Sequence, residues 1–171
     1  MIYTFIPYAP KDHPKCLGWA YNRFMELLPH NEDWAVLMDH DAMFTTSTWY
    51  SQIEDIIEKN IQYSCFVPKC NRVGCYLQRL GNRHNHDMVY HREIGKKTQE
   101  EKYSIVTDLT ETPHLFTGVC MILKKSAWED IKFKESGFLG VDTRMCGLLK
   151  QKKYKIGVLE GVYVYHWYRF K

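Results

Sequence analysis

The feature that most constrains this chain is a short apolar run that ends in two acids. Residues 34–38 read Trp-Ala-Val-Leu-Met, and Asp39, His40 and Asp41 follow directly. An apolar run of this length is typical of a buried strand. Side chains two residues apart in an extended chain point the same way, so Asp39 and Asp41 are expected on one side. The alternative interpretation is a solvated turn that carries two unrelated acids.

Two neighbouring carboxylates repel each other unless a positive charge lies between them. A divalent cation such as Mg²⁺ or Mn²⁺ prefers oxygen ligands and often binds phosphate groups at the same time. The Asp39 and Asp41 pair therefore predicts a metal site at the edge of a sheet.

Strand and helix patterns alternate through the first half of the chain. Apolar runs predict strands at 2–6, 34–39 and 61–67, and apolar residues at helical spacing predict helices at 14–28 and 46–59. This alternation predicts an α/β fold with a mostly parallel central sheet flanked by helices. Ligands of such sheets bind at the carboxyl ends of strands, which is where the two acids fall.

The second half of the chain begins with a long polar stretch at 79–104, rich in arginine, lysine and histidine. We interpret it as a mobile basic loop, since long loops inside compact domains are commonly functional or disordered. Regular structure is expected again after it, with strands at 118–123, 154–159 and 162–165 and helices at about 126–131 and 142–152.

Length and composition restrict the class of protein. A chain of 171 residues that is 45% hydrophobic predicts one domain spanning 1–171 with a substantial core. The net charge of +3 is too small to indicate a nucleic-acid partner. No apolar run reaches the length of a membrane span, and the first residues lack the pattern of a signal peptide. Six scattered cysteines favour free thiols, so we expect a cytoplasmic protein.

Several motifs carry a resemblance when they are read in order. They are Ile6-Pro7-Tyr8, the stretch from Gly18 to Arg23, Asp39-His40-Asp41, the stretch from Thr117 to Ile122, the stretch from Gly137 to Asp142, and Tyr165-His166-Trp167. In this order the chain resembles a small glycosyltransferase of the Rossmann-like GT-A fold, similar to glycosyltransferase family 2. The resemblance covers most of the chain. It implies transfer of a sugar from a nucleoside-diphosphate sugar to a glycan or other hydroxyl acceptor.

The resemblance also implies a metal site for Mn²⁺ or Mg²⁺. Asp39 and Asp41 would hold the ion, which neutralises charge on the diphosphate leaving group. Similar enzymes complete the site with a late histidine, and His166 stands in that place. The alternative for His166 is a core residue with its hydrogen bonds satisfied.

A general base is implied at Asp142, which matches the second acid of the family's Glu-Asp pair; Val141 stands at the first position. In inverting members this carboxylate takes the proton from the acceptor hydroxyl. The alternative is a helix N-cap, for which aspartate is well suited.

The donor pocket departs from the family. Family members place a second strand, with an acid that reads the nucleotide base, between the first strand and the acidic motif, and only one helix fits there in this chain. Tyr8 is then expected to stack on a base, and Lys11 or Arg23 to meet a phosphate. The resemblance implies a uridine nucleotide, which is the commonest choice among similar enzymes. The full expected donor set is Pro7, Tyr8, Lys11, Asp12, Gly18, Tyr21, Asn22, Arg23, Asp39, His40, Thr117 and Gly118.

Asn71 and Arg72 follow the strand at 61–67 and are expected to border the donor sugar or the acceptor. A plain turn is the equal alternative, since asparagine and the nearby glycine serve turns.

Three rival functions remain open from the sequence. One is a structural zinc site built from Cys65, Cys70, Cys75, His84, His86 and His91, although a spacing of five between the cysteines differs from usual zinc motifs. Another is a metal-dependent phosphodiesterase or nuclease that uses Asp39 and Asp41 with some of the histidines. The third is a non-catalytic domain that binds a nucleotide sugar or a glycan.

Overall fold

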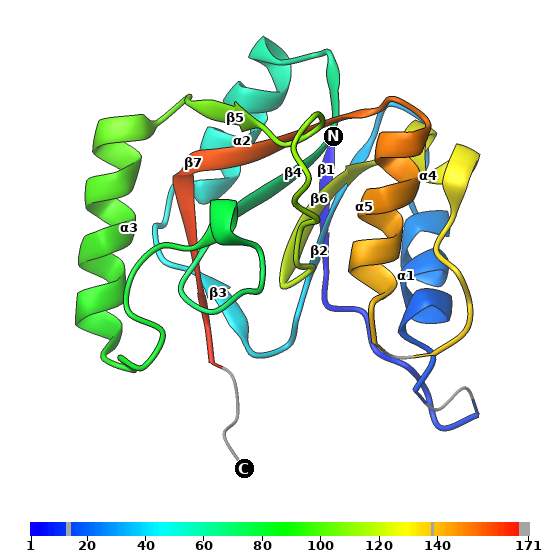
Figure 1. Ribbon diagram of the computed structural model, residues 1–171, viewed down its shortest axis with the longest axis horizontal. Helices are drawn as coiled ribbons and strands as arrows, with labels where there is room; N and C mark the ends of the chain where they lie inside the picture. The colour runs from blue at the N-terminus through cyan, green and yellow to red at the C-terminus, as the bar shows by residue number, and fades with distance from the viewer. Residues whose placement is uncertain (13–14, 138, 168–171) are drawn as a thin grey trace.

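The computed structural model describes residues 1–12, 15–137 and 139–167 (Figure 1). Residue 14, the first of an expected helix, and Phe138, within the motif from Gly137 to Asp142, lie outside the described residues, as do residues 168–171.

A seven-stranded sheet forms the centre of the described molecule. Its strands are β1 (Ile2–Phe5), β2 (Trp34–Met38), β3 (Ala42–Phe44), β4 (Tyr63–Cys70), β5 (Val106–Asp108), β6 (Cys120–Lys124) and β7 (Lys155–His166). They lie in the order β1-β2-β6-β4-β7-β3, and β5 pairs with β7. The expected α/β class is confirmed.

Strand directions determine which strand ends meet at one edge of the sheet. β1 and β2 are parallel, β4 and β7 are parallel, and β6 runs antiparallel between β2 and β4. β1, β2, β4 and β7 therefore point the same way, whereas β3, β5 and β6 run opposite to them. The expectation of a mostly parallel sheet holds for those four strands, but the sheet as a whole is mixed. The carboxyl ends of β2, β4 and β7 meet the start of β6 at one edge.

Helices cover the sheet, and their bounds follow the expected apolar periodicity where it was visible. They are α1 (Leu17–Glu26), α2 (Trp49–Lys59), α3 (Met88–Lys102), α4 (Lys125–Ile131), α5 (Val141–Gln151) and the short 3₁₀ helix η1 (Tyr76–Gln78). Figure 1 shows α1, α4 and α5 gathered on one side, and α3 at the far end beside β7.

The alternation of side chains along the strands builds a core on each face of the sheet. Ala35 and Leu37 of β2 face a cluster formed with α1, α4 and α5. Trp34 and Val36 of the same strand face the opposite cluster, which includes Ile53 of α2. A strand buried on both faces is apolar throughout, which explains the uninterrupted run at 34–38.

The stretch at 79–104 is not a continuous loop, because residues 88–102 form helix α3. Asp87 caps this helix by accepting a hydrogen bond from the Val89 N–H at 2.9 Å. The buried residues of α3 are His91, Gly95 and Thr98. None of these is a large apolar residue, so the buried face has helical spacing without the hydrophobic signal that would reveal it.

The two strands expected at 154–159 and 162–165 are one strand, β7. Its pairing with β4 has an irregularity where partners change from Pro68–Leu159 to Lys69–Tyr163. Figure 1 shows a sharp bend in β7. β5 pairs with the first part of β7 and β3 with its last residues, and both short strands were absent from the sequence-based prediction.

Within the described residues, no helix combines the length and the apolar character that crossing a membrane requires. All six cysteines are free thiols, and five of them are buried.

Candidate functional site

Three potential metal ligands lie after β2, before β3 and at the end of β7. Asp39 follows β2, and its N–H donates to the Val119 carbonyl at 2.9 Å, just before β6. The Ala42 N–H donates to the Asp39 carbonyl at 3.1 Å and so closes a turn. Asp41 lies in this turn, directly before β3. Ala42 pairs with His166, the last residue of β7. The turn and the β3–β7 pairing therefore bring His166 to the two acids.

The ligand atoms of Asp39, Asp41 and His166 all lie within 4.8 Å of one another. The sequence predicted a shared side through an extended chain, but the two acids converge through a turn instead. Asp39 and Asp41 are partly buried, and His166 is buried.

The geometry of His166 favours a cation beside it. Its Nδ1 lies 3.0 Å from the Arg72 carbonyl oxygen, which can only accept, so Nδ1 carries a proton. Its Nε2 lies 3.3 Å from Asp41 Oδ1. In the neutral ring, the Nε2 lone pair and a carboxylate oxygen face each other, and a metal ion or a second proton makes that arrangement favourable.

Burial raises the pKa of Asp39 to about 6; His166 opposes this shift, and the charge of Asp41 adds to it. A carboxyl group with a raised pKa in a cleft is a frequent property of functional sites. The raised pKa means that neighbouring charges and hydrogen bonds do not fully offset the cost of burying the charged form of Asp39.

Asn71 holds the end of β7 in place. Its Oδ1 accepts from the His166 N–H at 2.8 Å, and its Nδ2 donates to the His166 carbonyl at 3.3 Å. With the Arg72 carbonyl on the imidazole, the segment after β4 fixes both the backbone and the ring of His166. Asn71 and Arg72 are thus positioned by more than a plain turn, and both border the cavity described next.

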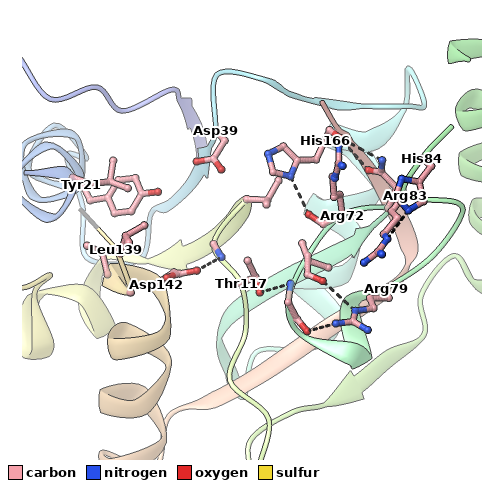
Figure 2. A pocket seen from close by; sticks show the side chains of 18 residues that line it. Tyr21, Asp39, Arg72, Arg79, Arg83, His84, Thr117, Leu139, Asp142 and His166 are labelled. Atoms are coloured by element: carbon pink, nitrogen blue, oxygen red, sulfur yellow. Dashed lines mark hydrogen bonds between the residues drawn. The ribbon is translucent and has the colours of Figure 1, made fainter. Parts of the chain in front are cut away.

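A cavity of about 610 Å³ is lined by two of the three ligands, Asp39 and His166, whereas Asp41 lies outside its lining (Figure 2). Its volume lies within the range typical of small-molecule sites. The lining residues are Leu17, Tyr21, Asp39, Asn71, Arg72, Val73, Gly74, Arg79, Arg83, His84, Thr117, Gly118, Val119, Leu139, Gly140, Val141, Asp142 and His166.

Asp142 lies in the first turn of α5 and faces this cavity. Its Oδ2 accepts from the Gly118 N–H at 2.6 Å, so the carboxylate is held by the segment before β6. The N-cap of α5 is Gly140, in the left-handed region, and therefore the N-cap interpretation of Asp142 is wrong. A side chain at Gly118 would overlap Asp142, which explains the glycine at that position.

Tyr21 reaches the cavity from α1, and Figure 2 shows its hydroxyl directed toward the space between Asp39 and Asp142. Burial raises the pKa of Tyr21, and the charges of Asp39 and Asp142 raise it further. The hydroxyl therefore stays protonated and can donate a hydrogen bond.

Thr117 holds together another part of the cavity wall. Its Oγ1 accepts from the Gly74 and Cys75 N–H groups, each at 3.1 Å. The buried Gln78 clamps the Thr117 backbone, accepting from its N–H at 2.8 Å and donating to its carbonyl at 3.2 Å. Gln78 was not identified from the sequence.

Several residues of the expected donor set do not line the cavity. They are Pro7, Tyr8, Lys11, Asp12, Gly18, Asn22, Arg23 and His40. Of the expected set, Tyr21, Asp39, Thr117 and Gly118 are brought together there.

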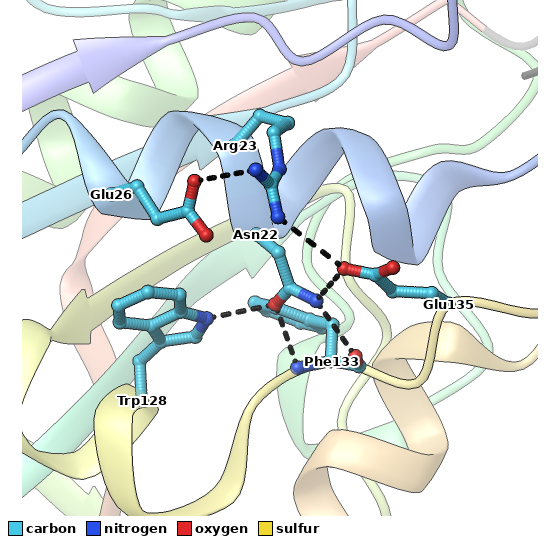
Figure 3. Close-up of polar contacts among 6 residues, drawn as sticks. All are labelled: Asn22, Arg23, Glu26, Trp128, Phe133 and Glu135. Atoms are coloured by element: carbon cyan, nitrogen blue, oxygen red, sulfur yellow. Dashed lines mark hydrogen bonds and ion pairs between the residues drawn. The ribbon is translucent and has the colours of Figure 1, made fainter.

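The reason is clearest for Asn22, whose side chain joins α1 to the segment after α4 (Figure 3). Its Oδ1 accepts from Trp128 Nε1 and from the Phe133 N–H, both at 2.9 Å. Its Nδ2 donates to the Phe133 carbonyl at 2.9 Å and to Glu135 at 2.8 Å. This amide serves packing, and the expected donor role is not supported by its position.

Arg23 and Gly18 are also used in packing. Arg23 pairs with Glu26 at 3.0 Å (Figure 3). Its guanidinium also lies over the ring of Trp19. A side chain at Gly18 would overlap the Lys134 carbonyl. Tyr8 packs edge-on against Phe24, with ring centroids 6.1 Å apart, in a separate surface groove.

The zinc alternative finds no support in the arrangement of the thiols. Among residues 1–12, 15–137 and 139–167, the group of side chains that could hold a metal is Asp39, Asp41 and His166. Cys65 is buried in the core, and His91 bonds to Tyr163 and to the Asn85 carbonyl.

Comparison with protein-family models and with curated proteins gives no match for this chain. The chemistry of the cavity therefore carries the functional argument. It combines two of the three ligands suited to a divalent cation, a positioned carboxylate, and a wall that bears arginines.

Proposed function

We propose that the protein is a glycosyltransferase that moves a sugar from a nucleoside-diphosphate sugar to a hydroxyl acceptor with the help of Mn²⁺ or Mg²⁺. The observation that carries the proposal is the convergence of Asp39, Asp41 and His166 beside a cavity that is lined by Asp39, His166 and Asp142. The order of sequence motifs that resemble GT-A enzymes of family 2 supports the same conclusion.

The chemistry of the ligand set fits the proposed metal. Carboxylates suit both Mg²⁺ and Mn²⁺, and the imidazole favours Mn²⁺ of the two. The Nε2 of His166 and the carboxylate of Asp41 already face each other at 3.3 Å. When bound, a divalent ion would neutralise the charge that develops on the diphosphate leaving group.

Asp142 is the proposed general base. As the acceptor oxygen bonds to the anomeric carbon, Asp142 takes the hydroxyl proton, and the electron pair of the broken bond leaves with the diphosphate. The Gly118 N–H binds one carboxylate oxygen at 2.6 Å and so fixes the direction of the other. Attack opposite to the leaving group inverts the anomeric configuration.

Binding of UDP, measured by calorimetry, tests the proposal. UDP should bind in the presence of Mn²⁺ and lose most of its affinity when the metal is chelated. Asp41→Asn removes one ligand charge and should abolish the metal-dependent part. The control is Glu111→Gln, the same change at an exposed carboxylate outside the cavity. Metal-independent UDP binding that is unaltered in Asp41→Asn would contradict the proposal.

Turnover then separates the alternatives. Release of UDP from UDP-sugars supports a transferase. Mn²⁺-dependent cleavage of bis(p-nitrophenyl) phosphate without such release would instead support a phosphodiesterase. Metal-dependent binding without either reaction would indicate a non-catalytic domain.

A further inference from the structure

The cavity has a basic wall at some distance along the chain from the three metal ligands. Arg79 and Arg83 lie on it, both exposed to solvent. Figure 2 shows them on the opposite side of the cavity from Asp142. The proposed mechanism gives neither arginine a role.

The guanidinium of Arg79 is held in a fixed orientation. Its Nε donates to the Val73 carbonyl at 3.1 Å, and its Nη2 donates to the Gly74 carbonyl at 2.9 Å. An arginine has five N–H donors, so three remain after these two bonds. Because the group is already ordered, a ligand that binds it loses little additional side-chain entropy.

Arg83 is ordered by its own neighbour. Its Nε donates to His84 Nε2 at 2.9 Å. The segment that carries it is also fixed, since Asn82 Oδ1 accepts from the His84 N–H at 2.9 Å and the Tyr90 hydroxyl meets the Asn82 N–H at 3.1 Å. The Nη groups of Arg83 are not used in these bonds.

The charges of the two arginines are not neutralised by carboxylates. Within the described part of the chain, neither Arg79 nor Arg83 forms an ion pair, whereas Arg23, away from the cavity, pairs with Glu26 and Glu135. Two ordered guanidinium groups that face one cavity match the oxygens of a phosphate group, which arginine binds through paired N–H donors.

A charge balance also calls for such groups. A divalent ion between Asp39 and Asp41 carries no net charge together with its two carboxylates. A diphosphate brought to that site would therefore need further positive charge nearby, as would a phosphorylated acceptor.

We propose that Arg79 and Arg83 form a phosphate-binding subsite that acts independently of the metal. The inference deepens the proposed function and rests on it only for which substrate carries the phosphate. The two sources are the diphosphate of the donor and a phosphate group on the acceptor.

The test uses inorganic pyrophosphate in the presence of EDTA, followed by ³¹P NMR titration of the full chain. The unaltered protein should bind it, and Arg79→Gln and Arg83→Gln should each weaken binding by about tenfold, a common effect of losing a charged hydrogen-bonding partner. The matched control is Arg92→Gln, an exposed arginine on α3 that does not line the cavity. It should bind pyrophosphate normally.

Arg79 also holds the loop at Val73 and Gly74, so thermal unfolding of each variant checks that the fold is kept. Arg83→Gln, which leaves those two bonds intact, gives the answer if Arg79→Gln fails to fold. The proposal is overturned if the unaltered protein does not bind pyrophosphate, if both variants bind it normally, or if Arg92→Gln loses as much affinity.

A second measurement assigns the phosphate to its source. If the affinity for UDP with Mn²⁺ falls by the same factor in Arg83→Gln, the subsite binds the donor diphosphate. If only pyrophosphate binding falls, the subsite serves the second substrate. Pyrophosphate binding in EDTA is measured without the metal, so failure of the metal-dependent function and failure of the subsite give different results.

Discussion

The carboxylate of Asp39 lies where the protein disfavours its charge. Burial raises its pKa to about 6, and Asp41 adds to that effect, while His166 reduces it. The ordinary value for an unfolded chain is about 3.9. Between these two values the folded protein binds a proton that the unfolded chain has released, so the charge of Asp39 destabilises the metal-free fold increasingly as the pH rises toward 6.

Replacement of Asp39 by asparagine should therefore stabilise the metal-free protein. Above pH 6 the free energy of unfolding should increase by about 2–3 kcal/mol, because each pKa unit corresponds to about 1.4 kcal/mol. The gain should shrink as the pH falls from 6 to 4, where Asp39 becomes protonated in both states. Urea unfolding with EDTA at several pH values measures it, and Glu111→Gln serves as the control. Equal or lower stability of Asp39→Asn at pH 7.5 would contradict the prediction.

A second residue-scale prediction concerns Asp142. Asp142→Asn keeps an oxygen that can accept from the Gly118 N–H but removes the basicity. If Asp142 is the general base, release of UDP from the donor should slow by roughly 10²–10⁴, with water or an acceptor hydroxyl as the attacking group. Calorimetry should show nearly unchanged affinity for UDP with Mn²⁺. Near-normal turnover in this variant would place the base elsewhere.

At the scale of elements, the strands and helices with apolar periodicity were predictable from the sequence, and α3 was not. β2 and β6 are apolar on both faces and read clearly as buried strands. The inward face of α3 consists of His91, Gly95 and Thr98, and its contacts are hydrogen bonds and close packing. His91 Nδ1 lies 2.7 Å from the Tyr163 hydroxyl. The sequence offered two signals for α3, namely the helical spacing of these three residues and the turn residues before Asp87. Neither signal shows which polar residues become buried.

The packing of α3 can be tested with a matched pair of glycines. A Cβ at Gly95 would overlap the side chain of Thr45, whereas a Cβ at Gly147 of α5 meets open space. Gly95→Ala should lower the free energy of unfolding by about 1–3 kcal/mol through overpacking. Gly147→Ala should raise it by up to about 1 kcal/mol, because alanine favours the helix over glycine. Chemical denaturation measures both, and similar effects of the two changes would contradict the close packing of α3.

At the scale of the whole molecule, the position of the site could be predicted from the order of strands and helices. The complete set of residues that line the cavity could not. Asp39 and Asp41 were placed at a strand end by local sequence alone. His166 was assigned to the metal site only through the family resemblance. Its partner strand β3 has three residues and no distinctive sequence pattern, so the pairing could not be predicted. Arg79 and Arg83 were assigned to a loop, and their place on the cavity depends on Gln78, Thr117 and the turn after β4. Such contacts between distant segments have no local sequence signal.

The metal site joins parts of the chain that are far apart in sequence, so occupancy should stabilise the entire fold. Asp39 and Asp41 lie after β2, whereas His166 ends β7. At about one hundred times its dissociation constant, Mn²⁺ should increase the free energy of unfolding by about 2.7 kcal/mol, since only the folded chain assembles the three ligands. For a protein of this size the unfolding temperature should rise by roughly 5–10 °C. Calorimetry with Mn²⁺ and with EDTA measures the change. His166→Ala should remove most of it, whereas His114→Ala, at an exposed histidine outside the cavity, should retain it. A full Mn²⁺ effect in His166→Ala would show that the ion binds without the C-terminal end of β7.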